Sequence, residues 1–266
     1  MTDLTGVPLT EIRERLAASR SSRERKRMAA ILHRDPRRGA RSLGAWVERS
    51  EAARRVERAR LSKLFALRNR LFRSGLKFVA GVDEVGVGPL AGPLVAAAVI
   101  LPRRVDFRAL EKLDDSKRLN PRTRKTLELQ IRKQALAVFV SEVSSEEVDR
   151  LNTYRGALAA MRRAVAGLGV RPDHVLVDAR TIPDLAVPQT ALVHGDAIDG
   201  SIAAASIVAK VYRDALMCRL AEQHPGYGFN RHMGYGTREH LDALHRLGPS
   251  PAHRRSFAPV AQAFAR

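Results

Sequence analysis

The chain has 266 residues, 45% of them hydrophobic, and carries a formal net charge of +19 with a single cysteine. This length allows one substantial core in one or two domains, and the single Cys218 excludes an internal disulfide framework. The longest apolar run, residues 94–101, is too short to span a membrane, and no N-terminal stretch resembles a signal peptide, so we expect a cytoplasmic protein.

Much of the positive charge lies in the N-terminal part, where residues 1–76 hold 20 Lys and Arg against 8 Asp and Glu. Such a basic arm suits nucleic-acid phosphates or an anionic membrane surface, although a solvated helical face has a similar composition. Helical spacing over 9–33 and 43–72, interrupted around Pro36, predicts two helices. We expect residues 1–75 to form a basic helical extension and residues 76–266 to form the main domain.

After Gly75 the sequence changes to short apolar runs separated by helical patterns. Strands are predicted at 78–82, 94–101, 136–140, 175–178 and 191–193, and helices at 121–133, 146–168 and 201–222. Strands that come first and then alternate with helices indicate an α/β core.

Acidic residues stand where several of the predicted strands end. Asp83 and Glu84 follow one apolar run, Asp178 ends another, and Asp196 follows a shorter one. Buried carboxylates are costly without a neutralising partner, and an oxygen-rich set of this kind suits Mg²⁺ or Mn²⁺. Any one of these acids could instead be a helix cap or a surface charge, so the interpretation depends on the set.

The glycines of residues 86–91 also match a Gly-x-Gly-x-x-Ala dinucleotide loop, with Asp106 in place to bind a ribose. That motif needs a helix directly after the glycines, whereas Pro93 here introduces another strand-like run. The two acids that precede the glycines would also repel a pyrophosphate. The sequence context therefore opposes a dinucleotide site.

Ordered sequence blocks of this chain resemble those of bacterial ribonuclease HII, the type 2 ribonuclease H. The matching blocks are residues 81–93, 114–119, 151–152, 175–178, 195–197, 201–210, 234–240 and 253–257. The resemblance covers residues 77–260, and residues 35–38 are similar to the N-terminal region of longer bacterial members. It implies a ribonuclease H-like fold, with a mixed central sheet flanked by helices and a C-terminal helical segment in the catalytic domain.

The same resemblance implies a metal-dependent endonuclease that hydrolyses the RNA strand of RNA–DNA hybrids. It would also incise duplex DNA at embedded ribonucleotides, leaving 5′-phosphate and 3′-hydroxyl ends, as ribonucleotide excision repair requires. Asp83, Glu84, Asp178 and Asp196 fill the family's catalytic and metal-binding positions, and Asp83 would bridge two Mn²⁺ or Mg²⁺ ions. We expect a monomer without membrane contact.

The resemblance also implies nucleic-acid contacts by residues in the blocks 81–93, 114–119 and 234–240. The residues concerned are Gly86, Val87, Gly88, Ser116, Lys117 and Tyr235. In the family the glycine backbone approaches the ribonucleotide, whose 2′-hydroxyl distinguishes RNA from DNA, and a tyrosine packs on the adjoining deoxyribose. The serine and lysine would contact phosphates.

The chain departs from the family pattern at several positions around the site. Val87, His194, Ile198 and Met233 stand where basic side chains are usual, and Ala179-Arg180 replaces Gly-Asn. Fewer phosphate contacts should weaken binding and flatten its salt dependence, and the basic extension could compensate. The alternative function is a nucleic-acid-binding paralogue of the same fold with weak, relaxed or absent cleavage.

Overall fold

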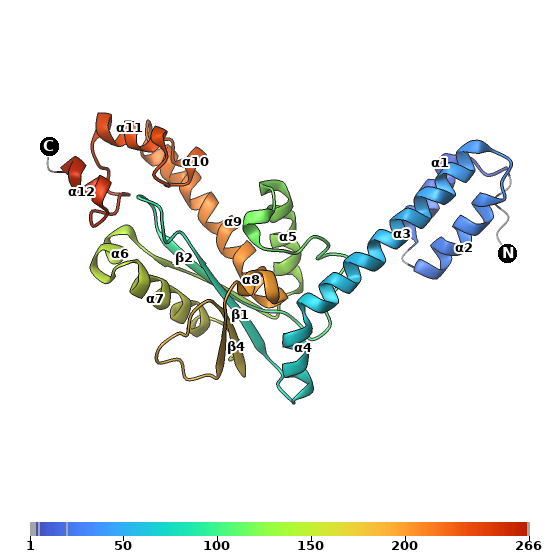
Figure 1. The fold of residues 1–266 in the computed structure, drawn as a ribbon, viewed down its shortest axis with the longest axis horizontal. Helices are drawn as coiled ribbons and strands as arrows, with labels where there is room; N and C mark the ends of the chain where they lie inside the picture. Colours follow the sequence, from blue (N-terminus) through green and yellow to red (C-terminus); the bar gives the residue numbers. More distant parts are fainter. Residues whose placement is uncertain (1–3, 5, 20, 265–266) are drawn as a thin grey trace. The chain divides into compact units, whose positions relative to one another are not determined.

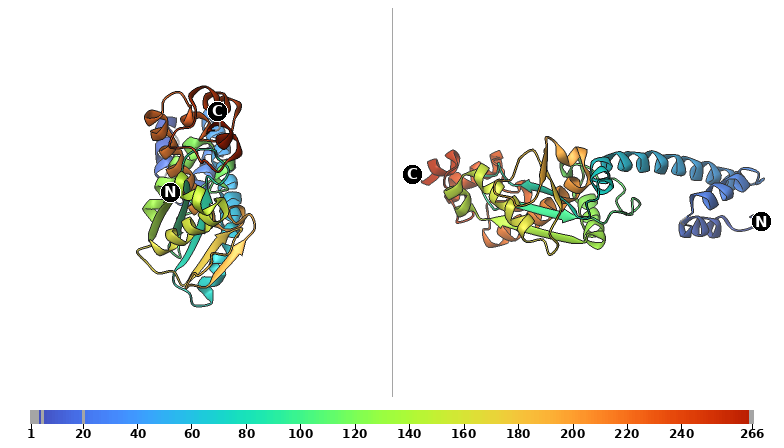
Figure 2. Two further views of the ribbon diagram at one scale, coloured as in Figure 1. Left: turned by 90° about the vertical axis from the view of Figure 1, so that its left-hand side faces the viewer. Right: turned by 90° about the horizontal axis from the view of Figure 1, so that it is seen from below.

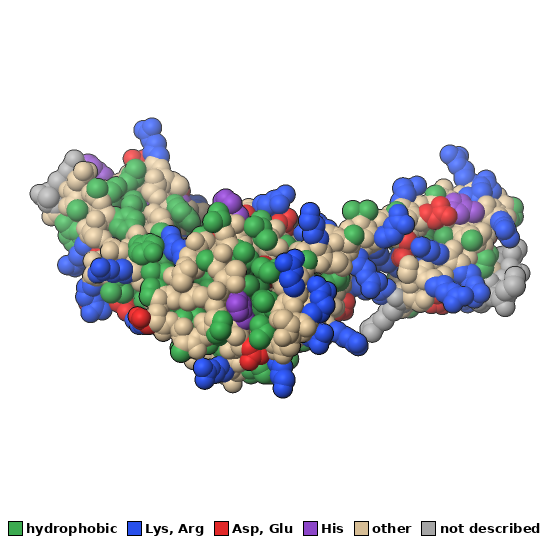
Figure 3. Space-filling view, turned by 60° about the horizontal axis from the view of Figure 1, so that its bottom comes forward, with side chains coloured by type: hydrophobic (Ala, Val, Ile, Leu, Met, Phe, Trp, Pro, Cys, Tyr) green, Lys and Arg blue, Asp and Glu red, His purple; other side chains and the backbone are tan. Residues whose placement is uncertain are grey.

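The computed structural model describes residues 4, 6–19 and 21–264, which fall into two compact units, residues 1–62 and 63–266. The first unit is helical and contains α1 (Leu9–Ala18), α2 (Ser22–His33) and most of α3 (Arg38–Leu64). Its own small core is formed mainly by leucine and alanine side chains from these helices. Lys and Arg side chains are spread over the face of this unit that Figure 3 shows.

Two predicted helices of the N-terminal part are each divided in two. The predicted helix 9–33 separates into α1 and α2, and the Ser21 side chain caps α2 by accepting the Glu24 N–H. The predicted helix 43–72 separates at Phe65 into α3 and α4 (Ala66–Arg73). The apolar spacing continues across the break at Phe65, whereas residues 19–27 contain no apolar side chain, so only the second break lacks a signal in the sequence.

The second unit is built on a five-stranded mixed sheet of order β3-β2-β1-β4-β5 (Figure 1). The strands are β1 (Val79–Val85), β2 (Leu94–Ile100), β3 (Ala137–Val143), β4 (His174–Asp178) and β5 (Gln189–Leu192). The first three pair antiparallel, whereas β4 and β5 run parallel to β1. This mixed sheet confirms the predicted α/β core.

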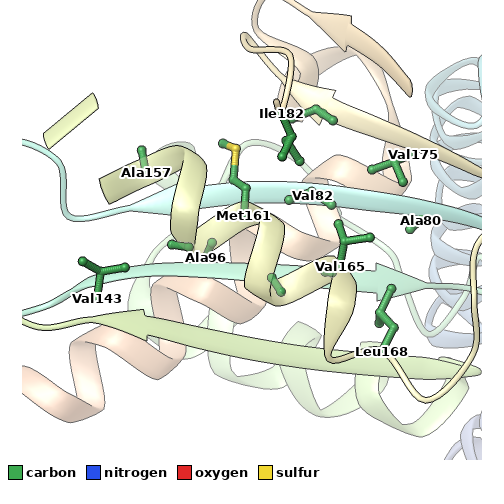
Figure 4. Packing of buried hydrophobic residues seen from close by; sticks show 14 of the residues in the cluster. Ala80, Val82, Ala96, Val143, Ala157, Met161, Val165, Leu168, Val175 and Ile182 are labelled. Carbon is green, nitrogen blue, oxygen red and sulfur yellow. The ribbon is translucent and has the colours of Figure 1, made fainter. Parts of the chain in front are cut away.

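Two long helices contact the central strands of this sheet, α7 (Thr153–Ala166) and α9 (Gly200–Gln223). Figure 4 shows the α7 side, where Met161 and Val165 pack over Val82 and Ala96. The predicted helix 146–168 is in fact α6 (Ser145–Leu151) followed by α7. Asn152 causes the break, because its φ is +67° and its side chain caps α7.

On its other face β1 lies so close to α9 that only glycine fits at one position. A Cβ on Gly81 would overlap the carbonyl group of Ser201 and come within 2.5 Å of the Ile202 amide nitrogen. Both groups are backbone and cannot rotate away. This approach fixes the start of α9 against the strand that carries Asp83 and Glu84.

Further helices complete the second unit. They are the 3-10 helix η1 (Ser116–Arg118), α5 (Pro121–Gln134), α8 (Gly195–Ile198), α10 (Phe229–His232), α11 (Arg238–Leu247) and α12 (Ala258–Phe264). Figures 1 and 2 show α11 and α12 together at the end of the sheet where the chain passes from β1 to β2. No helix in the described parts of the chain has the length and apolar character needed to cross a membrane.

Candidate active site

The two adjacent acids lie within β1, because the strand continues beyond the predicted residues 78–82 to Val85. Alternate residues of a strand face opposite sides of the sheet. Asp83 faces the α9 side of the sheet, as Gly81 does, and Ser206 of α9 donates a hydrogen bond to its carboxylate. Glu84 shares the α7 side with Val82. Both side chains are thus near the end of the strand, but they leave it in different directions.

Asp83 is the most buried of the four predicted metal ligands, with 5% of its surface exposed. Its Oδ1 accepts the Glu84 backbone N–H at 2.7 Å. Burial raises the pKa of Asp83 well above its usual value of 3.8, and the neighbouring carboxylates of Glu84, Asp178 and Asp196 raise it further. The structure therefore gathers the acids that the sequence analysis singled out from three separate segments.

Asp178 and Asp196 reach the cluster from neighbouring elements. Val82 of β1 pairs with Val177 of β4, so the parallel register places Asp178 beside Asp83. Asp178 Oδ1 accepts the Gly195 N–H at 2.6 Å, at the start of the short helix α8 that carries Asp196. Asp196 is 6% exposed, and burial, followed by Asp115 and Asp178, raises its pKa.

Glu84 is held by an arginine that the sequence analysis noted only as a departure from the family. Arg180 Nη1 donates to Glu84 Oε1 at 3.2 Å, and its guanidinium lies over the Tyr154 ring at 5.4 Å. The other oxygen, Glu84 Oε2, is buried without a hydrogen-bond partner. Burial raises the pKa of Glu84, while Arg180 opposes the rise.

The residues present fit a divalent cation. The donors are all carboxylate oxygens, as Mg²⁺ and Mn²⁺ prefer, and a buried oxygen of Glu84 lacks any partner. Within residues 6–19 and 21–264 no three His, Cys, Asp or Glu side chains are arranged as a complete ligand set. Two of the acids are instead turned toward Gly195 and Arg180.

The predicted nucleic-acid contacts on the glycine loop, residues 86–92, lie next to Tyr235. A Cβ on Gly88 would be 3.9 Å from Tyr235 Cε1, and Tyr235 itself is exposed. Gly86 adopts a φ of +89°, and a Cβ there would overlap Arg213 Nε. Val87 packs its side chain against the hydrophobic core. Only the backbone of Val87 is therefore placed to serve a ligand beside Tyr235.

Ser116 and Lys117 of η1 have different surroundings. Ser116 is 4% exposed, and its hydroxyl oxygen lies 2.9 Å from that of Ser206, the residue that also bonds Asp83. Burial disfavours the charge of Lys117, but Asp115, Asp196 and the other acids outweigh it and raise its pKa. A cation therefore stands beside the acidic cluster, and a buried hydroxyl links η1 to α9.

Functional candidates that sequence reasoning missed are arginines. Arg180 was treated only as a departure, and Arg254 only as part of a matching block, although Arg254 is fully buried and bonds the glycine loop. An arginine that is buried against backbone carbonyls has no periodic or spacing signal in the sequence. The block at residues 253–257 was the one available indication.

A similar fold occurs among solved structures. The crystal structure of the ribonuclease H2 from Pyrococcus horikoshii OT3 is 25% identical, with a TM-score of 0.58, over 71% of this chain and 98% of that chain. The mixed sheet with helices on both faces, and acids on its central strands, is thus the ribonuclease H-like fold.

Sequence comparison shows which family of proteins with this fold the chain resembles. The curated Ribonuclease HII of Anaeromyxobacter sp. (strain Fw109-5) is 48% identical over 98% of this chain and 82% of its own length. That of Myxococcus xanthus (strain DK1622) is 49% identical over 87% of this chain and 78% of its own length. The family model for Ribonuclease HII matches residues 80–260. The chain belongs to the ribonuclease HII family, which confirms the predicted resemblance and fold.

Proposed function

We propose that this protein is a metal-dependent endoribonuclease of the ribonuclease HII type. Its substrates are the RNA strand of RNA–DNA hybrids and single ribonucleotides embedded in duplex DNA, and it acts in the cytoplasm, in ribonucleotide excision repair. One observation carries the proposal. Four acids from β1, β4 and α8 gather at the end of the sheet, where Asp83 is buried among like charges.

The acids Asp83, Glu84, Asp178 and Asp196 would hold two Mg²⁺ or Mn²⁺ ions. When bound there, the ions would supply the activation of the attacking water and the stabilisation of the leaving 3′ oxygen. The protein's own contribution is orientation, because Ser206 and the Glu84 N–H hold Asp83 while the Gly195 N–H holds Asp178. The products would carry 5′-phosphate and 3′-hydroxyl ends.

Substrate selection is assigned to the backbone of Gly86, Val87 and Gly88 together with Tyr235. Because Gly88 has no side chain, its backbone is open to a ribose bound against the exposed tyrosine ring, and backbone groups there could read the 2′-hydroxyl. Lys117 would contact a phosphate next to the acids, since its ammonium is held charged by them. A phosphate contact by Ser116 stays a prediction, because its hydroxyl bonds Ser206 in this structure.

A cleavage assay on a defined duplex tests the function. The substrate is a labelled DNA duplex that contains one ribonucleotide, incubated with Mg²⁺ or Mn²⁺ and compared with an all-DNA duplex of the same sequence. We expect incision only at the ribonucleotide, loss of incision in EDTA, and product ends that a DNA polymerase can extend. Binding to both duplexes without incision would favour the alternative, a non-cleaving paralogue.

The Gly88→Ala variant should lose activity while keeping its stability. The added methyl group has ordinary space in the free protein, 3.9 Å from Tyr235, and the φ of Gly88 suits alanine. It would, however, cover the Gly88 backbone where a ribose bound against the ring would have to approach it. We expect kcat/KM on the single-ribonucleotide duplex to fall roughly 10- to 100-fold, as for a misplaced substrate, with Tm unchanged. An unaltered kcat/KM would show that substrate does not approach the Gly88 backbone.

Residues 1–75 are proposed to act as a basic extension that binds duplex phosphates. Arg54, Arg55 and Arg58 are exposed on α3, and we expect their joint replacement by Gln to weaken duplex binding. The slope of log K against log salt should fall by about 0.9 for each phosphate that the variant no longer neutralises. The control is the triple replacement of Arg13, Arg23 and Lys26, which are also exposed in this unit. Equal effects in both variants would indicate a general charge effect.

A further inference from the structure

The side chain of Arg254 is fully buried and donates hydrogen bonds to the glycine loop, residues 86–92. Arg254 Nη1 donates to the Val87 carbonyl at 2.9 Å, and Nη2 donates to those of Gly86 at 2.6 Å and Gly92 at 2.9 Å. Burial lowers the pKa of Arg254 to about 9, and the cation of Arg213 lowers it as well. A planar guanidinium presents five N–H donors in a rigid fork, whereas an ammonium has three donors on a flexible stem and cannot reproduce that spacing. One side chain thus bonds three carbonyl groups of the loop.

The segment that carries Arg254, residues 250–257, is also joined to the loop through its backbone. The Arg254 N–H donates to the Leu90 carbonyl at 2.9 Å, and the Gly92 N–H donates to the Ala252 carbonyl at 2.8 Å. On the outside of the segment, the Asp149 carboxylate accepts the N–H groups of Arg255 at 2.8 Å and Ser256 at 2.9 Å. The segment is therefore fixed on one side to the loop and on the other to α6.

The same segment reaches Tyr235 through two histidines. His240 Nδ1 lies 2.9 Å from the Tyr235 carbonyl, and His240 Nε2 lies 3.1 Å from His253 Nε2. His253 Nδ1 accepts the Ser250 N–H at 3.0 Å. Burial lowers the pKa of both histidines, that of His253 to about 4. Two neutral rings satisfy every bond when His240 carries its proton on Nδ1 and His253 on Nε2.

We infer that Arg254 is a positioning residue for ribonucleotide selection. Through residues 250–257 it fixes the glycine loop, and the His253–His240 pair fixes Tyr235 from the same segment. The spacing between the two surfaces that would enclose the ribose is thus set by residues that contact no substrate. This inference rests on the proposed function, and it adds the group that makes the selection geometry rigid.

The test compares Arg254→Lys with Arg255→Lys in the full-length protein. Arg255 is the exposed neighbour, and its side chain lies over Phe264 rather than on the loop. For Arg254→Lys we expect kcat/KM on the single-ribonucleotide duplex to fall roughly 10- to 100-fold, because the loop is misplaced. Affinity for an all-DNA duplex, measured with Ca²⁺, should change less than about twofold, since phosphate contacts dominate it. Amide hydrogen exchange in residues 86–92 should become faster.

The control, Arg255→Lys, should leave kcat/KM, the affinity for all-DNA duplex and the amide exchange of residues 86–92 unchanged.

Asp149→Ala provides a second variant in case Arg254→Lys does not fold, because the half-buried Asp149 carboxylate bonds the segment from the side opposite the loop. It should change ribonucleotide selectivity and loop exchange in the same direction, by a smaller factor. The inference is overturned if folded variants lose activity equally on all substrates, or keep both selectivity and loop exchange unchanged. A wild-type protein that binds but does not incise would instead contradict the proposed function. In that case the rate of amide hydrogen exchange in residues 86–92 of the variants would still test whether Arg254 holds the loop.

Discussion

Replacing Asp83 by Asn should abolish cleavage while leaving the fold intact. The amide keeps the shape of the side chain and an oxygen for the Glu84 N–H, but it removes the charge that would hold the cations. Loss of a metal contribution of several kcal/mol corresponds to a fall in kcat of about 10³ or more. Single-turnover incision of the ribonucleotide duplex in Mg²⁺ measures the effect. Asp184→Asn, at an exposed position away from the cluster, is the matched control and should cleave normally.

The same variant should become more stable than the wild type in the absence of metal. Because the pKa of Asp83 in the folded state is above its usual 3.8, the native protein binds more protons than the unfolded chain over the interval between these values. Stability should therefore fall as pH rises from about 4 through the raised pKa, and Asn at this position removes that loss. Urea unfolding in EDTA at pH 5 and pH 8 measures it. A pH dependence identical in both proteins would show that Asp83 is not destabilised by burial.

Gly81→Ala should be the most destabilising single methyl addition in the sheet. The new Cβ would overlap the Ser201 carbonyl group and approach the Ile202 nitrogen to 2.5 Å, so β1 and α9 would have to separate. Overpacking of a core usually lowers the free energy of unfolding by about 1–3 kcal/mol, and here, against rigid backbone, about 3 kcal/mol or more is expected. For a unit of this size that is a fall in Tm of roughly 6–12 °C.

Gly169→Ala is the control for this prediction. A Cβ at Gly169 would meet nothing within 4 Å, and the residue is exposed, so Tm should stay the same. Thermal unfolding followed by circular dichroism compares the two variants directly. If Gly81→Ala melts with the wild type, the close approach of β1 and α9 described above does not exist in solution.

Much of the core was predictable because its elements are short, apolar and periodic. The predicted strands at 94–101 and 175–178 and the predicted helix 121–133 agree closely with β2, β4 and α5. The helix breaks were not predictable, because they depend on local geometry such as the positive φ of Asn152. The helical spacing of apolar residues continues across such a residue, so the sequence pattern does not reveal the break.

The candidate site was predictable in its acids but not in what holds them. Acids at strand ends are visible in the chain order, and the sheet brings Asp83 and Asp178 together by register. The Glu84–Arg180 pair joins residues far apart in the sequence, and the bonds from Arg254 to the glycine loop span a larger separation still. Contacts of this kind follow from the tertiary fold, since no local pattern specifies them.

The parallel pairing of β1 and β4 gives the acidic cluster two parts of unequal local stability. Asp83 and Asp178 stand on adjacent hydrogen-bonded strands at the centre of the sheet, so their separation requires sub-global opening of the sheet. Asp196 stands on α8, a helix of four residues held partly by the Gly195 N–H bond to Asp178. Native-state hydrogen exchange should therefore find slow amides around the first pair and fast amides in α8. We therefore expect the cluster to lose and regain Asp196 through local opening of α8 while the sheet remains folded.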